Sequence, residues 1–279
     1  MTMPTEGDLR SFLGRVEEVV YNHPVVVDNT YTKWFAKGEA TLPEVRHLGV
    51  QFSVFSHQFV AAQLRKVINA ADIESYRAGK EILMNELGVV FRPPASAEKV
   101  ASEAGDGAEE ADPDLVGTEG TVDGGRFRFS AAHFEWLVNF GAPLGLRFQD
   151  MGKRRHATPG TIFFCDELLR IYGAADPSVA EGASYAVEHW AAAGFWKELI
   201  AGLRAFKARE CPALPLGFWV WHDKIEDQHA AHTAEELEQA FRTPGFDEEK
   251  FLHGAREMLD GVKAFWDGLW SDYMVGRAA

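Results

Sequence analysis

The chain has 279 residues, of which 46% are hydrophobic and 25% are charged, as in an ordinary globular protein. Its 28 basic and 42 acidic residues give a formal net charge of −14, which disfavours nucleic acid and anionic membranes as partners. No apolar run reaches the roughly 18 residues that would predict a membrane span. The N-terminus also lacks a signal-peptide pattern, so we expect a cytoplasmic protein. The two cysteines, Cys165 and Cys211, match no disulfide or zinc pattern.

Apolar residues recur at three-to-four spacing along nearly the whole chain, which predicts an all-α protein. Pro24 ends the first helix, and Thr41 fits the N-cap of a long helix with Pro43 in its first turn. We expect helices over residues 7–22, 25–35, 42–70, 73–90, 130–145, 158–172, 177–209, 216–240 and 247–275.

Residues 93–126 do not fit the helical pattern. Between Ala95 and Gly125 there are nine acidic residues and a single Lys. Such a segment buries too little apolar surface to offset its ordering entropy. We therefore expect a flexible acidic insertion inside a single helical domain that spans residues 1–279.

The sharpest pattern of metal-ligating residues lies in the predicted helix 216–240. His222, Glu226 and His229 follow at i, i+4 and i+7, which places them along one face of the helix. Phe218 and Trp219 lie one turn earlier, which indicates that this face points inward. Buried imidazoles and a carboxylate are costly unless they are paired or bind a metal, and this donor set suits iron, manganese or zinc. A hydrogen-bonded polar stripe without metal is the alternative.

Three further residues are candidates for the same chemistry. Glu188 lies in the helix 177–209 beside apolar residues, whereas the neighbouring His189 points about 100° away and is expected to be structural. Glu86 and His133 flank the insertion, which can loop out at small entropic cost. The Glu-x-x-His pattern from Glu44 to His47 is a weaker candidate for metal binding. Glu44 lies in the first turn of its helix, where the helix dipole already favours a carboxylate.

The chain resembles the heme-oxygenase-like diiron oxidases, which are relatives of the TenA thiaminases and of pyrroloquinoline-quinone synthase. The resemblance covers most of the chain outside residues 93–126. Asn85-Glu86-Leu87-Gly88 is similar to the segment that carries the family's first carboxylate ligand, and His133-Phe134-Glu135-Trp136-Leu137 is similar to the segment that opens with a ligand His. Tyr185-Ala186-Val187-Glu188 is similar to the segment that carries the family's central Glu. The pattern His222-x3-Glu226-x2-His229 is similar to the family's terminal His-x3-Asp-x2-His, with Glu226 in place of Asp.

The resemblance implies a heme-oxygenase-like bundle of about seven to nine helices that binds two Fe2+ ions, with manganese as an alternative metal. The ligand set that it implies consists of Glu86, His133, Glu188, His222, Glu226 and His229. No catalytic residue beyond these ligands and no organic cofactor is predicted. Three Glu against two ferrous ions would leave a weakly positive site with open positions for oxygen.

The predicted function is that of a non-heme diiron oxidase or oxygenase that uses O2 to oxidise a small organic substrate, such as an amino acid, an amine or a fatty acid. We expect Lys197, Arg147 or Arg204 to hold a substrate carboxylate. The aromatic residues expected to line a pocket are Phe52, Phe55, Trp136, Trp190 and Trp219. An external electron donor and a homodimer are compatible with this interpretation. A metal-free TenA-like enzyme and a non-catalytic helical binding protein remain as alternatives.

Overall fold

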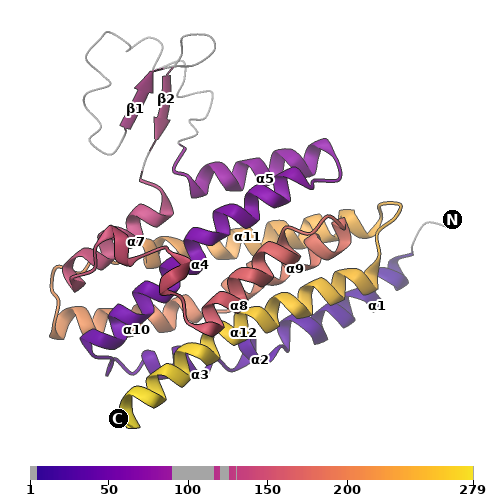
Figure 1. The fold of residues 1–279 in the computed structure, drawn as a ribbon. Coiled ribbons are helices and arrows are strands. Elements are labelled where there is room, and N and C mark those ends of the chain that lie inside the picture. The colour runs from indigo at the N-terminus through magenta and orange to yellow at the C-terminus, as the bar shows by residue number, and fades with distance from the viewer. Residues whose placement is uncertain (1–4, 90–115, 120–125, 130, 279) are drawn as a thin grey trace.

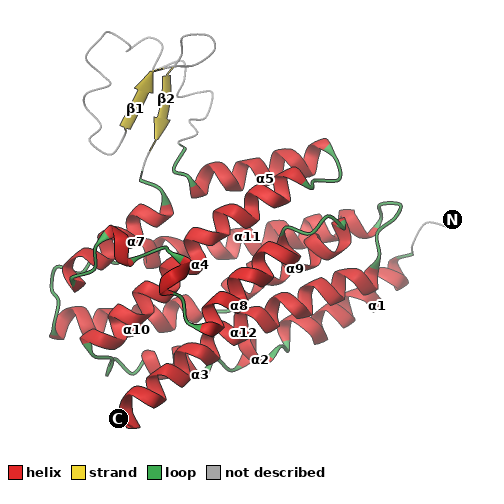
Figure 2. Cartoon of the chain, in the orientation of Figure 1, coloured by secondary structure: helices red, strands yellow, loops and turns green. Residues whose placement is uncertain are grey.

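The structure, a computed structural model, describes residues 5–89, 116–119, 126–129 and 131–278 (Figure 1). Of the strands and of residues 225–236, 277 and 278 it describes the backbone alone. Nearly all of the described elements are helices, which confirms the all-α prediction (Figure 2). Within the described residues, none of the helices combines the length and the apolar composition needed to cross a membrane.

The N-terminal half contains the first helices of the bundle and a small hairpin. Its elements are α1 (Glu6–Val16), a π-helical turn η1 (Glu17–Tyr21), α2 (Pro24–Val27), α3 (Thr30–Phe35), α4 (Leu42–Ile68), α5 (Ile73–Glu86), β1 (Val116–Glu119) and β2 (Arg126–Phe129). The long helix α4 begins as predicted, because Thr41 and Glu44 form a capping box and Pro43 lies in the first turn.

The C-terminal half completes the bundle. Its α-helices are α7 (His133–Gly141), α8 (Pro159–Glu167), α9 (Pro177–Ala191), α10 (Phe195–Arg209), α11 (Gly217–Phe241) and α12 (Glu248–Ala278). Between α7 and α8 lie the 3-10 turns η3 (Ala142–Leu144), η4 (Phe148–Asp150) and η5 (Arg154–His156), and a π-helical turn, η6 (Leu168–Tyr172), follows α8.

The described residues contain eleven α-helices, more than the seven to nine expected, because two predicted helices are each divided. The segment 177–209 breaks between α9 and α10 at Gly194, which has a φ of 93° that side-chain-bearing residues rarely adopt. The segment 25–35 breaks between α2 and α3, where Asn29 leaves the helical conformation and its side chain caps Thr32. In both places the apolar residues keep their helical spacing across the break, so the sequence pattern does not reveal it.

Two short strands lie within or next to the predicted insertion, where the sequence showed no strand-like alternation. β1 and β2 pair in antiparallel register, with Val116 opposite Phe129 and Glu119 opposite Arg126. In Figure 1 this hairpin projects from the bundle beyond α5 and α7. The bundle itself remains all-helical.

Helices α9 and α12 cross at unusually close range. A Cβ atom built on Gly182 of α9 would overlap the backbone of Phe251, and one built on Gly254 of α12 would overlap the backbone of Val179. Only glycine permits such an approach, so these two residues fix the distance between the helices. This crossing holds α9, the helix that carries Glu188, against the core.

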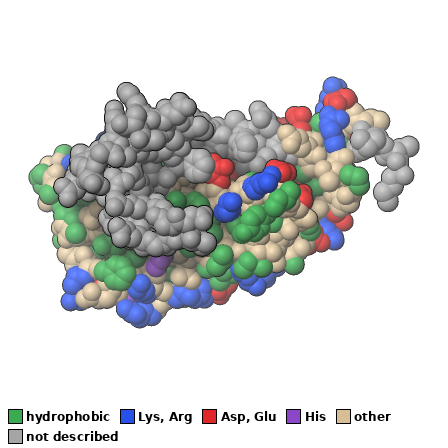
Figure 3. Space-filling view, turned by 90° about the horizontal axis from the view of Figure 1, so that it is seen from above, with side chains coloured by type: hydrophobic (Ala, Val, Ile, Leu, Met, Phe, Trp, Pro, Cys, Tyr) green, Lys and Arg blue, Asp and Glu red, His purple; other side chains and the backbone are tan. Residues whose placement is uncertain are grey.

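The core of the bundle is strongly aromatic. Phe52 of α4 is fully buried and contacts the rings of Trp219 and Trp266, whose centroids lie 4.7 Å and 6.4 Å away. The face shown in Figure 3 carries several Lys and Arg side chains along one margin.

Candidate metal centre

Glu86 and His133 meet at the base of the insertion. Glu86 is the last residue of α5 and His133 is the first residue of α7, and their side chains are only 13% and 9% exposed. The Nδ1 atom of His133 lies 3.1 Å from Oε1 of Glu86. The angles do not suit a hydrogen bond, however, so this buried Nδ1 has no hydrogen-bond partner among the described residues. An imidazole nitrogen and a carboxylate oxygen so placed fit a shared cation better than they fit each other.

His222 of α11 is the second imidazole of the site. Its ring centroid lies 4.9 Å from that of His133, at an interplanar angle of 71°. Nδ1 of His222 lies 2.7 Å from the carbonyl oxygen of Phe218, one turn earlier in α11. Nδ1–H donates to this carbonyl, and the neutral ring therefore carries its lone pair on Nε2. Trp196 stacks on the ring at 4.9 Å and keeps it in place.

Glu188 of α9 and Glu86 border the same buried phenol. Tyr172 is fully buried, and this burial raises its pKa well above 10, with further contributions from the charges of Glu188 and Glu86. Both carboxylates therefore act on Tyr172 electrostatically. Contacts bring together three of the six predicted ligands, Glu86, His133 and His222. Glu188 is related to them through the charge effect on Tyr172 that it shares with Glu86.

The polar residues around Tyr172 were not anticipated from the sequence. Tyr172 ends the π-helical turn η6, and its hydroxyl accepts a hydrogen bond of 2.7 Å from Nε2 of Gln63. Lys66, one turn further along α4, donates to Ser184 at 2.6 Å, and its Nζ lies 5.0 Å from the centre of the phenol ring. These side chains come from three distant segments and share no spacing pattern, so the sequence could not group them. The one local sign of a functional region is the π-helical turn, a feature that is frequent at functional sites.

The remaining two predicted ligands, Glu226 and His229, lie on α11, but their side chains fall outside the described residues. Among the side chains that the structure does describe, no group of three or more His, Cys, Asp or Glu is close enough to hold a metal ion. The described part of the site therefore consists of the Glu86–His133 pair with His222 beside it, and of Glu188, which acts on the same tyrosine as Glu86.

Other residues weighed from the sequence have structural roles. Glu44 caps α4, as its position predicted, and His47 lies 3.1 Å from Asp272 on α12. His189 is buried and its Nδ1 donates to the carbonyl of Tyr185 at 2.8 Å, which agrees with its expected structural role. Burial raises the pKa of the Cys165 thiol to about 12, so this cysteine is not a thiolate at neutral pH.

The residues expected to hold a substrate carboxylate do not line the pocket beside the candidate metal centre. Lys197 and Arg204 are exposed on α10, and Arg147 pairs with Asp150 at 3.1 Å. Of the five aromatic residues expected to line a pocket, Trp136 lines one of the two pockets described below. The other four line neither pocket and belong to the core: Phe52, Phe55, Trp190 and Trp219.

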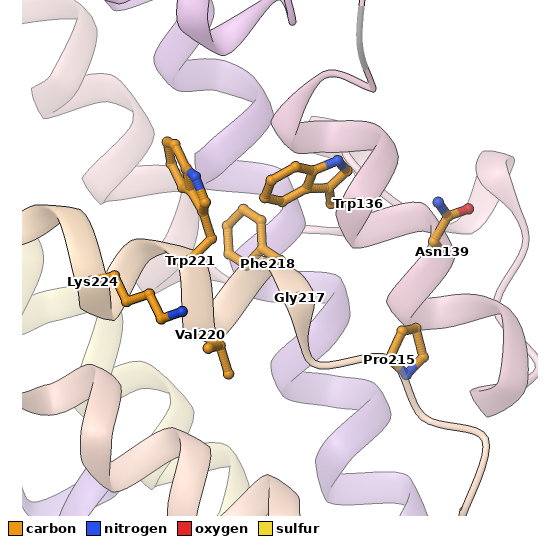
Figure 4. Close-up of a pocket in the computed structure, with 8 residues that line it drawn as sticks. All are labelled: Trp136, Asn139, Pro215, Gly217, Phe218, Val220, Trp221 and Lys224. Atoms are coloured by element: carbon orange, nitrogen blue, oxygen red, sulfur yellow. The ribbon is translucent and has the colours of Figure 1, made fainter. Parts of the chain in front are cut away.

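A pocket of about 450 Å³ opens between α7 and α11 (Figure 4). Trp136, Phe218 and Trp221 form its aromatic wall, and Lys224 and Asn139 add polar groups. The same wall borders His133, whose ring centroid lies 4.7 Å from that of Trp221 and 5.8 Å from that of Trp136. The side chains of Trp136 and Trp221 therefore lie between the pocket and His133 of the candidate metal centre.

Comparison with known proteins identifies the fold. No protein-family model and no curated protein matches the chain. A domain of unknown function with a heme oxygenase-like fold from Shewanella denitrificans matches with a TM-score of 0.59 and 14% identity, over 99% of this chain and 96% of that one. A TenA homolog from Pseudomonas syringae has a TM-score of 0.59 and 11% identity, over 94% of this chain and 92% of the other. A CADD-like protein of unknown function from Nostoc punctiforme has a TM-score of 0.59 and 16% identity, over 94% of this chain and 98% of the other.

These similarities define the fold of the bundle. The chain has the heme oxygenase-like helical fold, as the resemblance of its sequence motifs predicted, and it shares this fold with a TenA homolog. A shared fold does not by itself fix an activity, so the function rests on the side chains of the site.

Proposed function

We propose that the chain is a non-heme diiron oxidase or oxygenase that uses O2 to oxidise a small organic substrate of the amino acid, amine or fatty acid class. The observation that supports this most is the buried Glu86–His133 pair. It brings together two predicted ligands from opposite ends of the insertion, and it leaves Nδ1 of His133 without a hydrogen-bond partner among the described residues.

The donor chemistry fits iron. Glu86, His133, Glu188 and His222 supply two carboxylates and two imidazoles from four helices. Glu226 and His229 complete the proposed set on the basis of their spacing along α11 alone. Iron prefers mixed nitrogen and carboxylate ligation of this kind, and when bound it would supply the electrons for reducing O2. Manganese is the alternative metal.

The residues around the ligands prepare the site for this chemistry. The carbonyl of Phe218 fixes the tautomer of His222, which leaves Nε2 as the ligating atom. The rings of Trp196 and Trp221 pack against the imidazoles of His222 and His133 and reduce their contact with bulk water. Partial exclusion of water strengthens the charge interactions within the site.

The alternative of a metal-free TenA-like enzyme finds less support. Thiol-based chemistry requires a thiolate within a substrate pocket, and the buried thiol of Cys165 is protonated at neutral pH. Cys211 is partly exposed, but it lines neither of the two pockets and its Sγ lies 4.0 Å from the carbonyl oxygen of Pro143. A purely structural role would use the 3.1 Å contact between His133 and Glu86 as an ion pair, but it would leave Nδ1 of His133 without a hydrogen bond of good geometry among the described residues, which costs stability.

Anaerobic loading with Fe2+ followed by exposure to O2 tests the proposal. We expect about two irons per chain, a transient absorbance change with O2, and loss of both in Glu86→Gln. The matched control is Glu81→Gln, which removes an exposed carboxylate from the same helix. If wild type takes up no iron and consumes no O2, or if Glu86→Gln and Glu81→Gln bind iron equally, the proposal is wrong.

A further inference from the structure

A second pocket lies along the first turns of α4. It has a volume of about 830 Å³ and is lined by the first turns of α4 and by the segment between α7 and α8. Its lining includes none of the predicted metal ligands and no residue of the first pocket. It is therefore a separate site, and nothing in the proposed oxidase chemistry requires it.

The wall of this pocket is held by a buried amide. Gln51 is only 2% exposed, and its Nε2 donates to the carbonyl of His156 at 2.8 Å. Its Oε1 accepts from the backbone N–H of Thr158 at 2.9 Å. The nitrogen and the oxygen of one side-chain amide thus bind the segment before α8 to α4. The pocket is therefore part of the folded structure and does not depend on a loose loop.

The charged side chains that line the pocket are Arg46, Arg147 and Asp150, so its lining is net positive in a protein whose net charge is −14. His47, which also lines the pocket, lies 3.1 Å from Asp272 of α12. Asp150 is neutralised by Arg147, whose Nε lies 3.1 Å from a carboxylate oxygen. The guanidinium of Arg46 has no carboxylate or carbonyl partner among the described residues, so the pocket keeps an uncompensated positive charge.

The rest of the lining is apolar. Leu42, Val50 and Leu146 supply hydrocarbon surface next to the two guanidinium groups. A volume of this size lies within the range of pockets for small organic ligands and exceeds what a bare inorganic anion requires. Guanidinium groups bind phosphate and carboxylate through paired, charge-assisted hydrogen bonds.

We infer that this pocket binds a small organic anion, with its phosphate or carboxylate group on Arg46, beside the Arg147–Asp150 pair, and its apolar body against Leu42, Val50 and Leu146. Arg147 keeps the carboxylate of Asp150 from repelling the anion. Phosphate and carboxylate share the oxyanion chemistry that a guanidinium group recognises. The two sources differ in charge and shape, and a pair of probes with the same phenyl body separates them.

Calorimetric titration of the full chain with phenyl phosphate and with phenylacetate tests this site. We expect saturable binding of at least one probe, weakened at least tenfold in Arg46→Gln and in Arg147→Gln. The control Arg10→Gln removes an exposed arginine of α1 and the same charge, and it is expected to leave binding unchanged. Tighter binding of phenyl phosphate would identify a phosphate ester as the ligand, and tighter binding of phenylacetate a carboxylate.

A second measurement covers the case in which a variant does not fold. The bound probe is expected to protect Arg46 and Arg147 of the wild-type chain from modification by phenylglyoxal, and to leave Arg10 reactive. The inference fails if neither probe binds saturably, if Arg10→Gln weakens binding as much as Arg46→Gln does, or if protection is the same at all three arginines.

Discussion

The close crossing of α9 and α12 makes a specific prediction about stability. In Gly254→Ala, the added methyl group would overlap the carbonyl oxygen of Val179 and would lie 3.0 Å from its carbonyl carbon and 3.1 Å from its Cα. All three are backbone atoms of α9, so no side chain can rotate away to relieve the overlap. The helices would have to separate, and Gly182 offers the same close contact from the other side.

The expected size of the effect follows from two opposing contributions. Alanine is intrinsically better than glycine inside a helix by about 1 kcal/mol, whereas overpacking a fixed core typically costs about 1–3 kcal/mol and sometimes more. Because the overlap here is with backbone atoms, we expect the overpacking to dominate and Gly254→Ala to lower the free energy of unfolding by about 2 kcal/mol. At roughly 2–4 °C per kcal/mol, the melting temperature should fall by about 4–8 °C.

Urea unfolding monitored by circular dichroism measures this change, and Gly14→Ala is the matched control. Gly14 lies inside α1, and a methyl group added there would meet no heavy atom within 4 Å, so that variant should be stabilised by about 0.5–1 kcal/mol. If Gly254→Ala is as stable as the wild type, α9 and α12 can move apart freely and the argument that glycine sets their distance is refuted.

Three further predictions concern buried polar groups. Burial lowers the pKa of His57 below 6.5, so the unfolded chain binds the proton more readily, and the free energy of unfolding should fall as the pH drops below about 6.5; His57→Gln should reduce this slope in urea titrations at several pH values. Tyr172→Phe removes the acceptor for the buried Nε2 of Gln63 and should cost about 1–2 kcal/mol, much of which a second change, Gln63→Leu, should restore. With its pKa raised to about 12, the thiol of Cys165 should not react with Ellman's reagent until the chain unfolds, whereas the partly exposed Cys211 should react in the native state.

Each of these expectations has an outcome that contradicts it. A pH slope that is the same with and without His57 would mean that its burial does not persist in solution. Equal stability of Tyr172→Phe and the wild type would mean that the Gln63 amide has another acceptor. Two thiols titrating at once in the folded chain would place Cys165 at the surface.

Much of the fold follows from the spacing of apolar residues, since the predicted helix 216–240 corresponds to α11 at Gly217–Phe241 and 247–275 to α12 at Glu248–Ala278. The breaks within predicted helices were missed because the apolar period runs through them. At Gly194 the glycine was visible in the sequence, but only its positive φ shows that the chain turns there. The start of α4 was predictable because capping is local.

The candidate metal centre was only partly predictable. Helical spacing groups residues that share one helix, as with the motif that begins at His222, but it does not relate residues on different helices. The approach of Glu86 to His133 was therefore inferred from resemblance, and the structure provides the distance. The hydrogen bond between Gln63 and Tyr172 joins distant segments through side chains common in any core, and no sequence pattern marks it.

The contact between Glu86 and His133 also has a consequence for how the chain tolerates change. It lies where the backbone leaves α5 and where it re-enters at α7, so the bundle itself holds the two ends of the intervening segment together. The entropic cost of a longer loop between fixed ends grows only slowly, by roughly 0.6 kcal/mol for each doubling of its length. This junction is therefore a natural graft point, at which segments of very different length and composition can be exchanged while the helices below keep their packing.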